Sequence, residues 1–283
     1  MRAQLRQKGA ELTQVETLSS DIDSADDINQ NETGQSPQDA LLDRAKRVLD
    51  RLDQQINLMS NPVDGTCPVF HEDELFQIAL PWASFDAYQN RIVTRRGVTD
   101  NVLYNQLFDL MPTLSGKALL DIGSYTGLQA LVIRRFMSPS HVYMIEPQNM
   151  MQPLLRRTID ANPDGCPITL MQEVIDDETM PMAISAVRTE RLSETQYLRR
   201  ASGKLKSKSI DKLKLKNIGM INLDIPGSKI YALKGAETVL KKQRPVVMVN
   251  LSGRDATEMK EYMEPLSYEF VRIGAHAALF LPR

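Results

Sequence analysis

The chain has 283 residues, of which 42% are hydrophobic and 25% are charged, and its formal net charge is −2. These values are typical of a soluble globular protein with one large domain, or one domain and an appendage. Nothing in the net charge indicates a dedicated nucleic-acid or membrane binder, and no run of about 18 apolar residues is present to form a spanning helix.

The cysteines and histidines form no recognisable ligand pattern. Cys67 and Cys166 lie far apart, neither belongs to a CxxC pair, and the three histidines are scattered. Zinc sites need such ligands at short, regular spacings. We therefore expect a reduced, cytoplasmic protein that has no metal site and inserts no segment into a membrane.

The first 97 residues fall into two predicted parts. Residues 1–35 are polar and too poor in apolar side chains to offset the entropy of ordering, which predicts a disordered tail. Ser36 and Pro37 are typical of the start of a helix, and apolar residues then recur at helical spacing on one face as far as Ile56. We expect this helix to pack on the main domain; a dimerising coiled coil, and hence a homodimer, is the alternative.

The segment over residues 60–97 is rich in aromatic side chains and completes a predicted N-terminal helical and aromatic segment, residues 36–97. It contains the only tryptophan, Trp82, with Phe76 and Tyr88 among its other rings. These rings form either the core of a small subdomain, which the sequence favours, or a lid over a ligand. His71 in this segment is interpreted as an exposed loop residue rather than as a catalytic base.

From residue 98 the pattern becomes regular, with short buried strands alternating with helices. Thr99 or Asp100 is expected to cap a helix through Met111. The predicted strands are ALLDIG, HVYMIEP, PITLMQEVI, IGMINLDI and PVVMVNL, and the predicted helices are GLQALVIRRF, MMQPLLRRTIDAN, KIYALKGAETVLKKQ and ATEMKEYMEPL. Strands near YEFVRI and AALFLP close the chain as an antiparallel edge hairpin. Residues 98–283 are therefore predicted to form an α/β domain, Rossmann-like, with a doubly wound, mostly parallel sheet.

The turn after the first of these strands, LDIGSYTG, is the sharpest local motif. Gly123 allows a tight turn close to a ligand, and Gly127 lets the next helix pack near the strand. Asp121 ends the strand as an acceptor that faces the crevice. A carboxylate ahead of the glycines suits a ligand with an ammonium group better than a diphosphate, and Tyr125 stands where a middle glycine is expected. A plain tight turn is the alternative.

Two further carboxylates follow at strand ends. Glu146 ends the second strand, 25 residues after Asp121, where it can accept hydrogen bonds from the hydroxyls of a ribose; a solvated glutamate is the alternative. Asp224 ends the fourth strand beside the first, at the point where the strand order reverses and α/β sheets place ligands. Capping of the following helix is the alternative for Asp224.

These motifs resemble those of the FkbM methyltransferases, from about residue 98 to the C-terminus. LLDIGSYTG and VYMIEP are similar to the family's first two motifs, and SIDKL to the segment before its fourth strand. INLDIPGSKIYALKGAETVLKKQRPVVMVNL is the most specific part, because LKGA and RP fall at the family's spacing. Pro226, Lys229 and Asn250 stand where the family carries acidic residues, and Tyr125 where it carries an asparagine.

The resemblance implies a class I methyltransferase fold and S-adenosyl-L-methionine as the cofactor. Its expected cofactor-binding residues are Asp121, Gly123, Ser124, Tyr125, Gly127, Glu146 and Glu173. It also implies O-methylation of a sugar or secondary-metabolite hydroxyl, so the expected partner is a small-molecule or glycan acceptor and not a nucleic acid. Asp224 is the expected catalytic residue, which positions the acceptor or takes its proton.

Two other interpretations remain open. The chain could be a non-catalytic cofactor-binding module of methyltransferase fold, and Tyr125 disfavours a nicotinamide oxidoreductase.

Residues 199–216 hold eight basic residues against one acid. This stretch is interpreted as a solvated face rather than as a surface that follows phosphates or an anionic glycan.

Overall fold

A seven-stranded sheet organises the part of the chain that the computed structural model describes, which comprises residues 66–98, 100–184, 189–195, 197–199, 202–227, 229–251 and 255–283. The strand order is β12-β13-β11-β10-β3-β4-β5. The predicted tail and the predicted helix from Ser36 lie outside the described residues.

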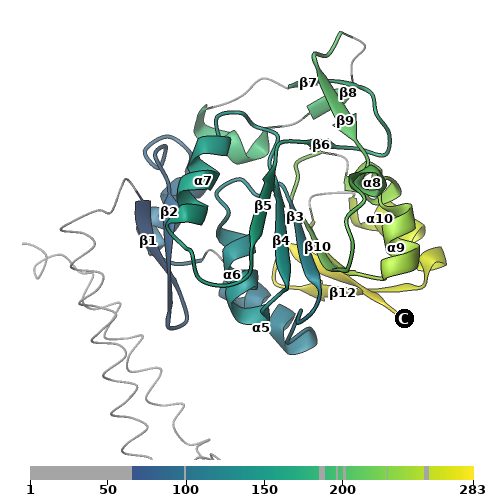
Figure 1. Ribbon diagram of the computed structural model, residues 1–283, viewed down its shortest axis with the longest axis horizontal. Coiled ribbons are helices and arrows are strands. Elements are labelled where there is room, and N and C mark those ends of the chain that lie inside the picture. Colours follow the sequence, from purple (N-terminus) through teal and green to yellow (C-terminus); the bar gives the residue numbers. More distant parts are fainter. Residues whose placement is uncertain are drawn as a thin grey trace, which may run out of the picture. The chain divides into compact units, whose positions relative to one another are not determined.

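Five neighbouring strands of this sheet run parallel to one another; β13 runs antiparallel to them, and the edge strand β12 pairs antiparallel with β13 (Figure 1). The order turns back on itself between β3 and β10, which pair with each other at its centre. This arrangement confirms the predicted doubly wound sheet and its C-terminal edge hairpin. The strands are β3 (Ala118–Ile122), β4 (His141–Ile145), β5 (Ile168–Met171), β10 (Ile218–Leu223), β11 (Val246–Asn250), β12 (Tyr268–Ile273) and β13 (Ala277–Pro282).

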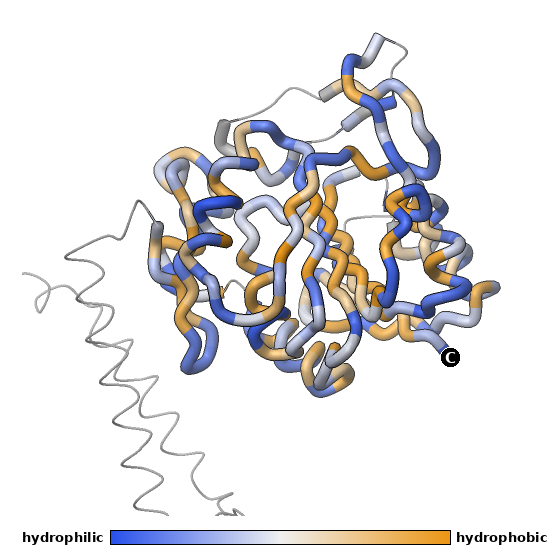
Figure 2. Tube along the Cα trace, in the orientation of Figure 1, coloured by the Kyte–Doolittle hydropathy of each residue, from blue (hydrophilic) through white to orange (hydrophobic). Residues whose placement is uncertain are grey.

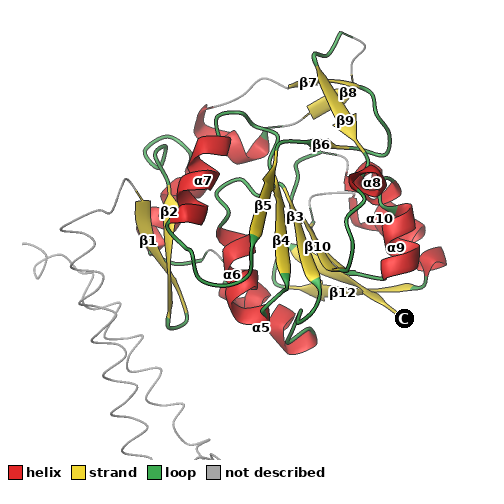
Figure 3. Cartoon of the chain, viewed as in Figure 1, coloured by secondary structure: helices red, strands yellow, loops and turns green. Residues whose placement is uncertain are grey.

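Helices cover both faces of the sheet and bury two separate apolar clusters (Figure 3). Successive residues of one strand enter different clusters: Leu119 of β3 packs on one side of the sheet, and Leu120 packs on the other. Strands buried on both faces must be apolar along their length, which is visible at the centre of Figure 2. The helices are α5 (Asn101–Leu110), α6 (Leu128–Met137), α7 (Gln152–Asp160), α8 (Lys229–Lys234), α9 (Glu237–Gln243) and α10 (Asp255–Met263).

Two helix boundaries test the sequence-based expectations directly. Asp100 caps α5 by accepting a hydrogen bond from the backbone N–H of Leu103 at 3.0 Å, so this predicted cap is confirmed. The single helix expected over KIYALKGAETVLKKQ is wrong, because α8 and α9 are separated at Gly235. A side chain at Gly235 would overlap the backbone carbonyl of Asp176, so the chain needs glycine for this close approach.

The aromatic-rich segment folds as a hairpin and a helix that share the core of the α/β sheet. Strands β1 (Thr66–His71) and β2 (Glu74–Ala79) pair antiparallel, and helix α4 (Ala87–Arg95) follows. β2 is joined to α7 by a hydrogen bond from the Ala79 N–H to Thr158 Oγ1 at 3.0 Å. Phe76 is buried in the same cluster as Leu119, whereas Phe85 is 66% exposed.

His71 does not lie in an exposed loop. It ends β1 with 2% of its surface exposed, and its ring packs against Tyr104 at 5.1 Å and Phe136 at 5.0 Å between centroids. The exposed-loop interpretation is therefore wrong: the hairpin turns this side chain toward α5 and α6, where aromatic rings enclose it.

The insert between β5 and β10 forms a small second sheet, at the top of the view in Figure 1. Its order is β6-β9-β7-β8, and the predicted strand PITLMQEVI is divided between the two sheets. Two short 3-10 helices, η2 (Thr189–Glu194) and η3 (Ile210–Leu213), lie in the same insert. No helix among the described residues has the length and apolar content needed to cross a membrane. The strands are β6 (Val174–Ile175), β7 (Pro181–Ile184), β8 (Tyr197–Arg199) and β9 (Leu205–Lys208).

Candidate functional site

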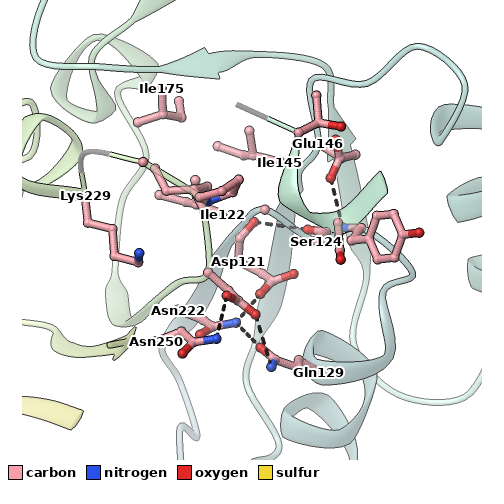
Figure 4. A pocket seen from close by; sticks show the side chains of 18 of the residues that line it. Asp121, Ile122, Ser124, Gln129, Ile145, Glu146, Ile175, Asn222, Lys229 and Asn250 are labelled. Atoms are coloured by element: carbon pink, nitrogen blue, oxygen red, sulfur yellow. Dashed lines mark hydrogen bonds between the residues drawn. The ribbon is translucent and has the colours of Figure 1, made fainter. Parts of the chain in front are cut away.

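A cavity of about 900 Å³ opens at the carboxyl ends of β3, β4, β10 and β11 (Figure 4). Its volume is at the upper end of the range of about 300–1,000 Å³ that ligand pockets occupy. Its walls also include residues of α4, of the β6–β9 insert and of the turn between β12 and β13. Seven of the eight residues expected from sequence line it: Asp121, Gly123, Ser124, Tyr125, Glu146, Glu173 and Asp224.

Backbone conformation explains the glycines of the turn between β3 and α6. Gly123 has φ +87°, and a Cβ atom there would overlap the backbone carbonyl of Asp224. Gly127 has φ +80°, and a Cβ atom would lie 3.1 Å from the Leu155 side chain on α7. Gly127 lies outside the cavity lining and serves the packing of α6. Gly123 brings the turn against the end of β10, which places the turn at the switch point.

Four backbone N–H groups of this turn are already used within the chain. Those of Gly123 and Ser124 donate to the Ile145 carbonyl at 2.9 and 3.1 Å, and that of Gly127 donates to the Ser124 carbonyl at 2.7 Å. The Tyr125 N–H donates to the Glu146 carboxylate at 3.0 Å. A diphosphate-binding turn presents such donors to its ligand. These four donors are therefore not available to the diphosphate of a dinucleotide.

Glu146 is held at the end of β4 by backbone donors. One carboxylate oxygen accepts from the Tyr125 N–H, and the other accepts from the Gln148 N–H at 2.9 Å. Only 3% of the residue is exposed, so the solvated-glutamate interpretation is wrong. Burial raises the pKa of Glu146 to about 7. Each carboxylate oxygen has a second lone pair, so Glu146 can still accept hydrogen bonds from ligand hydroxyls.

Asp121 is buried, and one of its carboxylate oxygens has no partner. Oδ1 accepts from the Asn222 amide at 2.6 Å, whereas Oδ2 has no hydrogen-bond partner among the described residues. Burial raises the pKa of Asp121 to about 6. A buried acceptor without a donor is rare in proteins. Since this oxygen belongs to a residue of the cavity wall, it fits a cationic ligand group.

Asp224 belongs to a hydrogen-bond network across three strand ends. Its two oxygens accept from the Asn250 amide at 3.1 Å and the Gln129 amide at 3.4 Å, and Asn222 donates to Gln129 at 2.8 Å. Both of these hydrogen bonds join Asp224 to side chains of β11 and α6. Burial raises the pKa of Asp224, while the Asn250 hydrogen bond and the Lys229 ammonium oppose that shift.

Glu173 and the basic stretch meet on the insert side of the cavity. Glu173 pairs with Lys208 at 2.5 Å, and Arg199 pairs with Asp176 and lies 3.6 Å above the Tyr231 ring. Lys208 and Arg199 of the basic stretch over residues 199–216 therefore pair with groups of the chain itself, as residues of a structural surface do.

Four of the cavity-wall residues that sequence reasoning missed are Asn222, Gln129, Tyr88 and Tyr197. Asn222 lies two positions before Asp224 on one side of β10, and Gln129 lies in the first turn of α6, so strand and helix periodicity could have found both. Tyr88 packs edge-to-face on Tyr125 with 5.7 Å between centroids, and Tyr197 comes from the insert. No local signal places these two tyrosines, because long-range packing brings them to the site.

Comparisons with known proteins give structural neighbours only. No family model matches the chain. No curated protein matches its sequence. The chain is similar to a solved structure of the methyltransferase FkbM from Methylobacillus flagellatus KT, with 19% identity and a TM-score of 0.43 over 58% of this chain and 43% of that one.

Two further solved structures are similar at lower identity. Precorrin-8w decarboxylase from Methanobacterium thermoautotrophicum has 13% identity and a TM-score of 0.40, over 63% of this chain and 88% of that one. A tRNA (uracil-54, C5)-methyltransferase of Pyrococcus abyssi, solved with S-adenosyl-L-homocysteine, has 12% identity and a TM-score of 0.41, over 77% of this chain and 44% of that one. The match therefore spans less than half of the Methylobacillus and Pyrococcus chains.

Proposed function

We propose that this chain is an S-adenosyl-L-methionine-dependent methyltransferase. The observation that carries the proposal is the pair of buried carboxylates at the ends of the adjacent strands β3 and β4, beside a turn that uses four of its backbone N–H groups within the chain. Asp121 offers an unpartnered oxygen to the cofactor's ammonium group, and Glu146 offers lone pairs to its ribose hydroxyls. A dinucleotide would need the donors that Gly123 and Tyr125 give to the chain itself.

The cofactor supplies an activated methyl group, so the protein has to align the acceptor and receive its proton. Asp224 is the proposed residue for this step. Burial raises its pKa, which makes the carboxylate a better proton acceptor than an exposed aspartate, and two amides fix its orientation. We propose a sugar or secondary-metabolite hydroxyl as the acceptor, in a cavity large enough for a second molecule beside the cofactor.

Calorimetric titration with S-adenosylhomocysteine and with NAD tests the cofactor assignment. We expect micromolar binding of S-adenosylhomocysteine, roughly −8 kcal/mol, and no binding of NAD. Glu146→Ala should weaken that binding by about 1.5–3 kcal/mol, the scale of charge-assisted hydrogen bonds. Glu269→Ala, at an exposed pair with Arg283 on β12, is the matched control and should bind normally. Equal affinity in the Glu146 variant would show that the ribose assignment is wrong.

A non-catalytic binding module is the second candidate, because amides already occupy both oxygens of Asp224. Turnover on a panel of glycan and small hydroxyl acceptors separates the two. A catalytic Asp224 predicts at least about a tenfold loss in Asp224→Asn, with nearly unchanged affinity for S-adenosylhomocysteine. Tight cofactor binding without turnover would favour the binding module, and undiminished turnover in Asp224→Asn would remove Asp224 from the mechanism.

A further inference from the structure

We infer, on the basis of the proposed function, that the amide oxygen of Gln148 accepts a hydrogen bond from the nucleoside of the cofactor, and that the buried Asp86 orients this amide. Gln148 lies two positions after Glu146, and both residues line the cavity. A chain of hydrogen bonds runs from the Gln148 side chain through η2 to the start of α4.

The Gln148 side chain has one satisfied end and one unsatisfied end. Its Nε2 donates to the Leu192 carbonyl at 3.3 Å, which determines where the amide places its oxygen. That oxygen, Oε1, is buried and has no hydrogen-bond partner among the described residues. A buried acceptor without a donor costs free energy, and a residue of the cavity wall can obtain its donor from a ligand. The partner that Gln148 needs is therefore an N–H or O–H group.

The position of Gln148 indicates which part of the cofactor it meets. Its backbone N–H donates to the Glu146 carboxylate at 2.9 Å, so Gln148 lies beside the group that is proposed to bind the ribose. The nucleoside of S-adenosyl-L-methionine has two kinds of donor, the ribose hydroxyls and the amino group of adenine. Either kind satisfies an amide oxygen. The ammonium group at the other end of the cofactor is assigned to Asp121.

Asp86 fixes the place of the Leu192 carbonyl. This carboxylate is fully buried and accepts two backbone hydrogen bonds, both at 2.9 Å: Oδ1 from the Gln89 N–H, and Oδ2 from the Leu192 N–H. The second bond joins η2 to the start of α4. Leu192 itself is 3% exposed, and its carbonyl also accepts from Thr195 Oγ1 at 2.9 Å. The group that holds the Gln148 amide is thus held in turn by the chain.

The start of α4 gives Asp86 a firm base. Gln89 Oε1 accepts from the Trp82 N–H at 3.0 Å, and its Nε2 donates to the Tyr125 hydroxyl at 3.1 Å. Asp86 does not belong to the cavity lining, so it acts on a ligand only through other residues. It is therefore a positioning residue, whereas Gln148 contacts the ligand.

Two variants of the full chain test the inference by calorimetric titration with S-adenosylhomocysteine. Gln148→Met removes the amide at similar side-chain length and should lower affinity roughly three- to tenfold, the range of one hydrogen bond. Asp86→Asn keeps an effective cap for α4, because asparagine caps helices as well as aspartate does. Its amide nitrogen cannot accept from the Leu192 N–H, so affinity should fall at least about threefold.

Asp211→Asn is the matched control. Asp211 of η3 also accepts two backbone hydrogen bonds, from Thr238 and Val239, but it lies outside the cavity lining. This change should lower the free energy of unfolding and leave affinity unchanged. The double variant of Asp86→Asn and Gln148→Met should bind as Gln148→Met does, because Asp86 acts through that amide. Fully additive losses would contradict the positioning role.

Four nucleosides that compete with S-adenosylhomocysteine show which donor Gln148 binds. They are adenosine, 2′-deoxyadenosine, 3′-deoxyadenosine and purine riboside, which lacks the amino group. Gln148→Met should weaken three of them and leave unchanged the one that lacks the bound donor. Equal weakening of all four would contradict a hydrogen bond to the nucleoside.

The outcomes separate this inference from the proposed function. If S-adenosylhomocysteine binds equally well to the parent and to Gln148→Met, the inference is wrong and the cofactor assignment stands. If it does not bind to the parent, the proposed function fails and the inference with it. Should the buried Asp86→Asn variant not fold, Gln148→Met and the four nucleosides decide.

Discussion

The turn between β3 and α6 uses four of its backbone N–H groups within the chain, and the carboxylates of Asp121 and Glu146 line the cavity beside it. Asp121 and Glu146 are consequently buried without a full set of charged partners, and burial raises the pKa of both. Burial of these carboxylates costs free energy in the ligand-free protein. Binding of a cation or of a hydroxyl-bearing ligand offsets that cost by giving the carboxylates hydrogen-bond partners.

Gly123→Ala should be among the most damaging single changes in the chain. The residue has φ +87°, and the new Cβ atom would overlap the backbone carbonyl of Asp224. We expect a loss of more than about 3 kcal/mol, since steric overlap adds to the usual strain of about 1–3 kcal/mol. Gly116→Ala is the matched control, because φ is +71° there and no atom lies within 4 Å. Urea unfolding measures the free energy of unfolding of both variants. Equal losses would contradict the close approach of Gly123 to the Asp224 carbonyl.

Stability should fall as the pH rises from about 4 to 7. The pKa values of Asp121 and Glu146 are raised in the folded protein, to about 6 and about 7 from 3.8 and 4.5. The folded state therefore holds these protons more tightly than the unfolded state. The stabilisation is complete below the unfolded pKa values and is lost as the pH rises through the folded ones, on the order of a few kcal/mol in total.

Urea unfolding of the cofactor-free protein between pH 4 and 8 measures this loss. Glu146→Gln should show a smaller change in the free energy of unfolding over the same range, because one of the carboxyl groups whose pKa is raised no longer titrates. Glu269→Gln, on the exposed face of β12, should behave as the parent does. An unchanged pH dependence in Glu146→Gln would show that Glu146 ionises normally.

Tyr197→Phe should separate stability from ligand binding. The hydroxyl is buried without a hydrogen-bond partner among the described residues, in the cavity wall. Its removal should leave the ligand-free protein as stable as the parent or slightly more stable. If the hydroxyl forms a hydrogen bond with the ligand, the change should also weaken the binding of S-adenosylhomocysteine by about 1 kcal/mol. Tyr262 also has a buried hydroxyl without a partner but lies outside the cavity, so Tyr262→Phe should not change affinity. Calorimetry and thermal unfolding of both variants provide the comparison.

Among single residues, sequence reasoning identified those that follow a recognisable strand pattern. Asp121, Glu146 and Asp224 each follow a strand pattern, and the structure brings all three to one cavity. His71 was misjudged because three aromatic rings from other elements enclose it. Tyr88 and Tyr197 could not be found, since their places depend on how α4 and the insert pack on the sheet.

Among the elements, η3 and α9 depend on each other through one side chain. Ala236, the residue before α9, makes no side-chain hydrogen bond that caps the helix. Asp211 of η3, which lies 25 residues earlier in the chain, provides the cap instead. Its two oxygens accept from the N–H groups of Thr238 and Val239 at 2.8 and 3.0 Å. The Asp211 N–H in turn donates to the Gly235 carbonyl at 2.9 Å. The segments SIDKL and LKGAETVL are thus one packing unit.

Asp211→Ala should cost about 0.5–2 kcal/mol of stability, the range for a lost helix cap. Two N–H groups at the start of α9 would lose their acceptor. Glu237→Ala removes an exposed pair with Lys241 on the same helix and should cost less than about 0.5 kcal/mol. Chemical denaturation compares the two, and a loss in Asp211→Ala no greater than in the control would show that the cap contributes nothing.

Element order was predictable wherever apolar periodicity was strong. The strands and helices from β3 to β13 follow the predicted order, because a parallel sheet imposes continuous apolar strands. The break between α8 and α9 and the four strands of the insert were not predictable. Gly235 interrupts the helix through a close approach to Asp176, some 60 residues earlier, and such a contact leaves no local trace in sequence.

For the molecule as a whole, we predict that the polar N-terminal stretch contributes nothing to the stability of the α/β domain. Residues 1–35 contain too few apolar side chains to bury a surface of their own. Deletion of these residues should leave the melting temperature and the affinity for S-adenosylhomocysteine unchanged. Differential scanning calorimetry measures the first, and a fall of more than a few degrees would mean that the stretch docks on the folded part.

The central pairing of β3 with β10 joins residues about 100 positions apart, as in the Asn222–Asp121 hydrogen bond. During synthesis, β3 has no partner on that side until Ile218–Leu223 leaves the ribosome. A nascent chain that ends before β10 thus exposes an apolar strand edge, which is a template for aggregation. It also lacks the part of the cavity wall that β10, β11 and the turn between β12 and β13 supply, so ligand can assist only the last stage of maturation. Closing so long a loop is slow, so this strand edge stays exposed for longer than one that a local hairpin would cover.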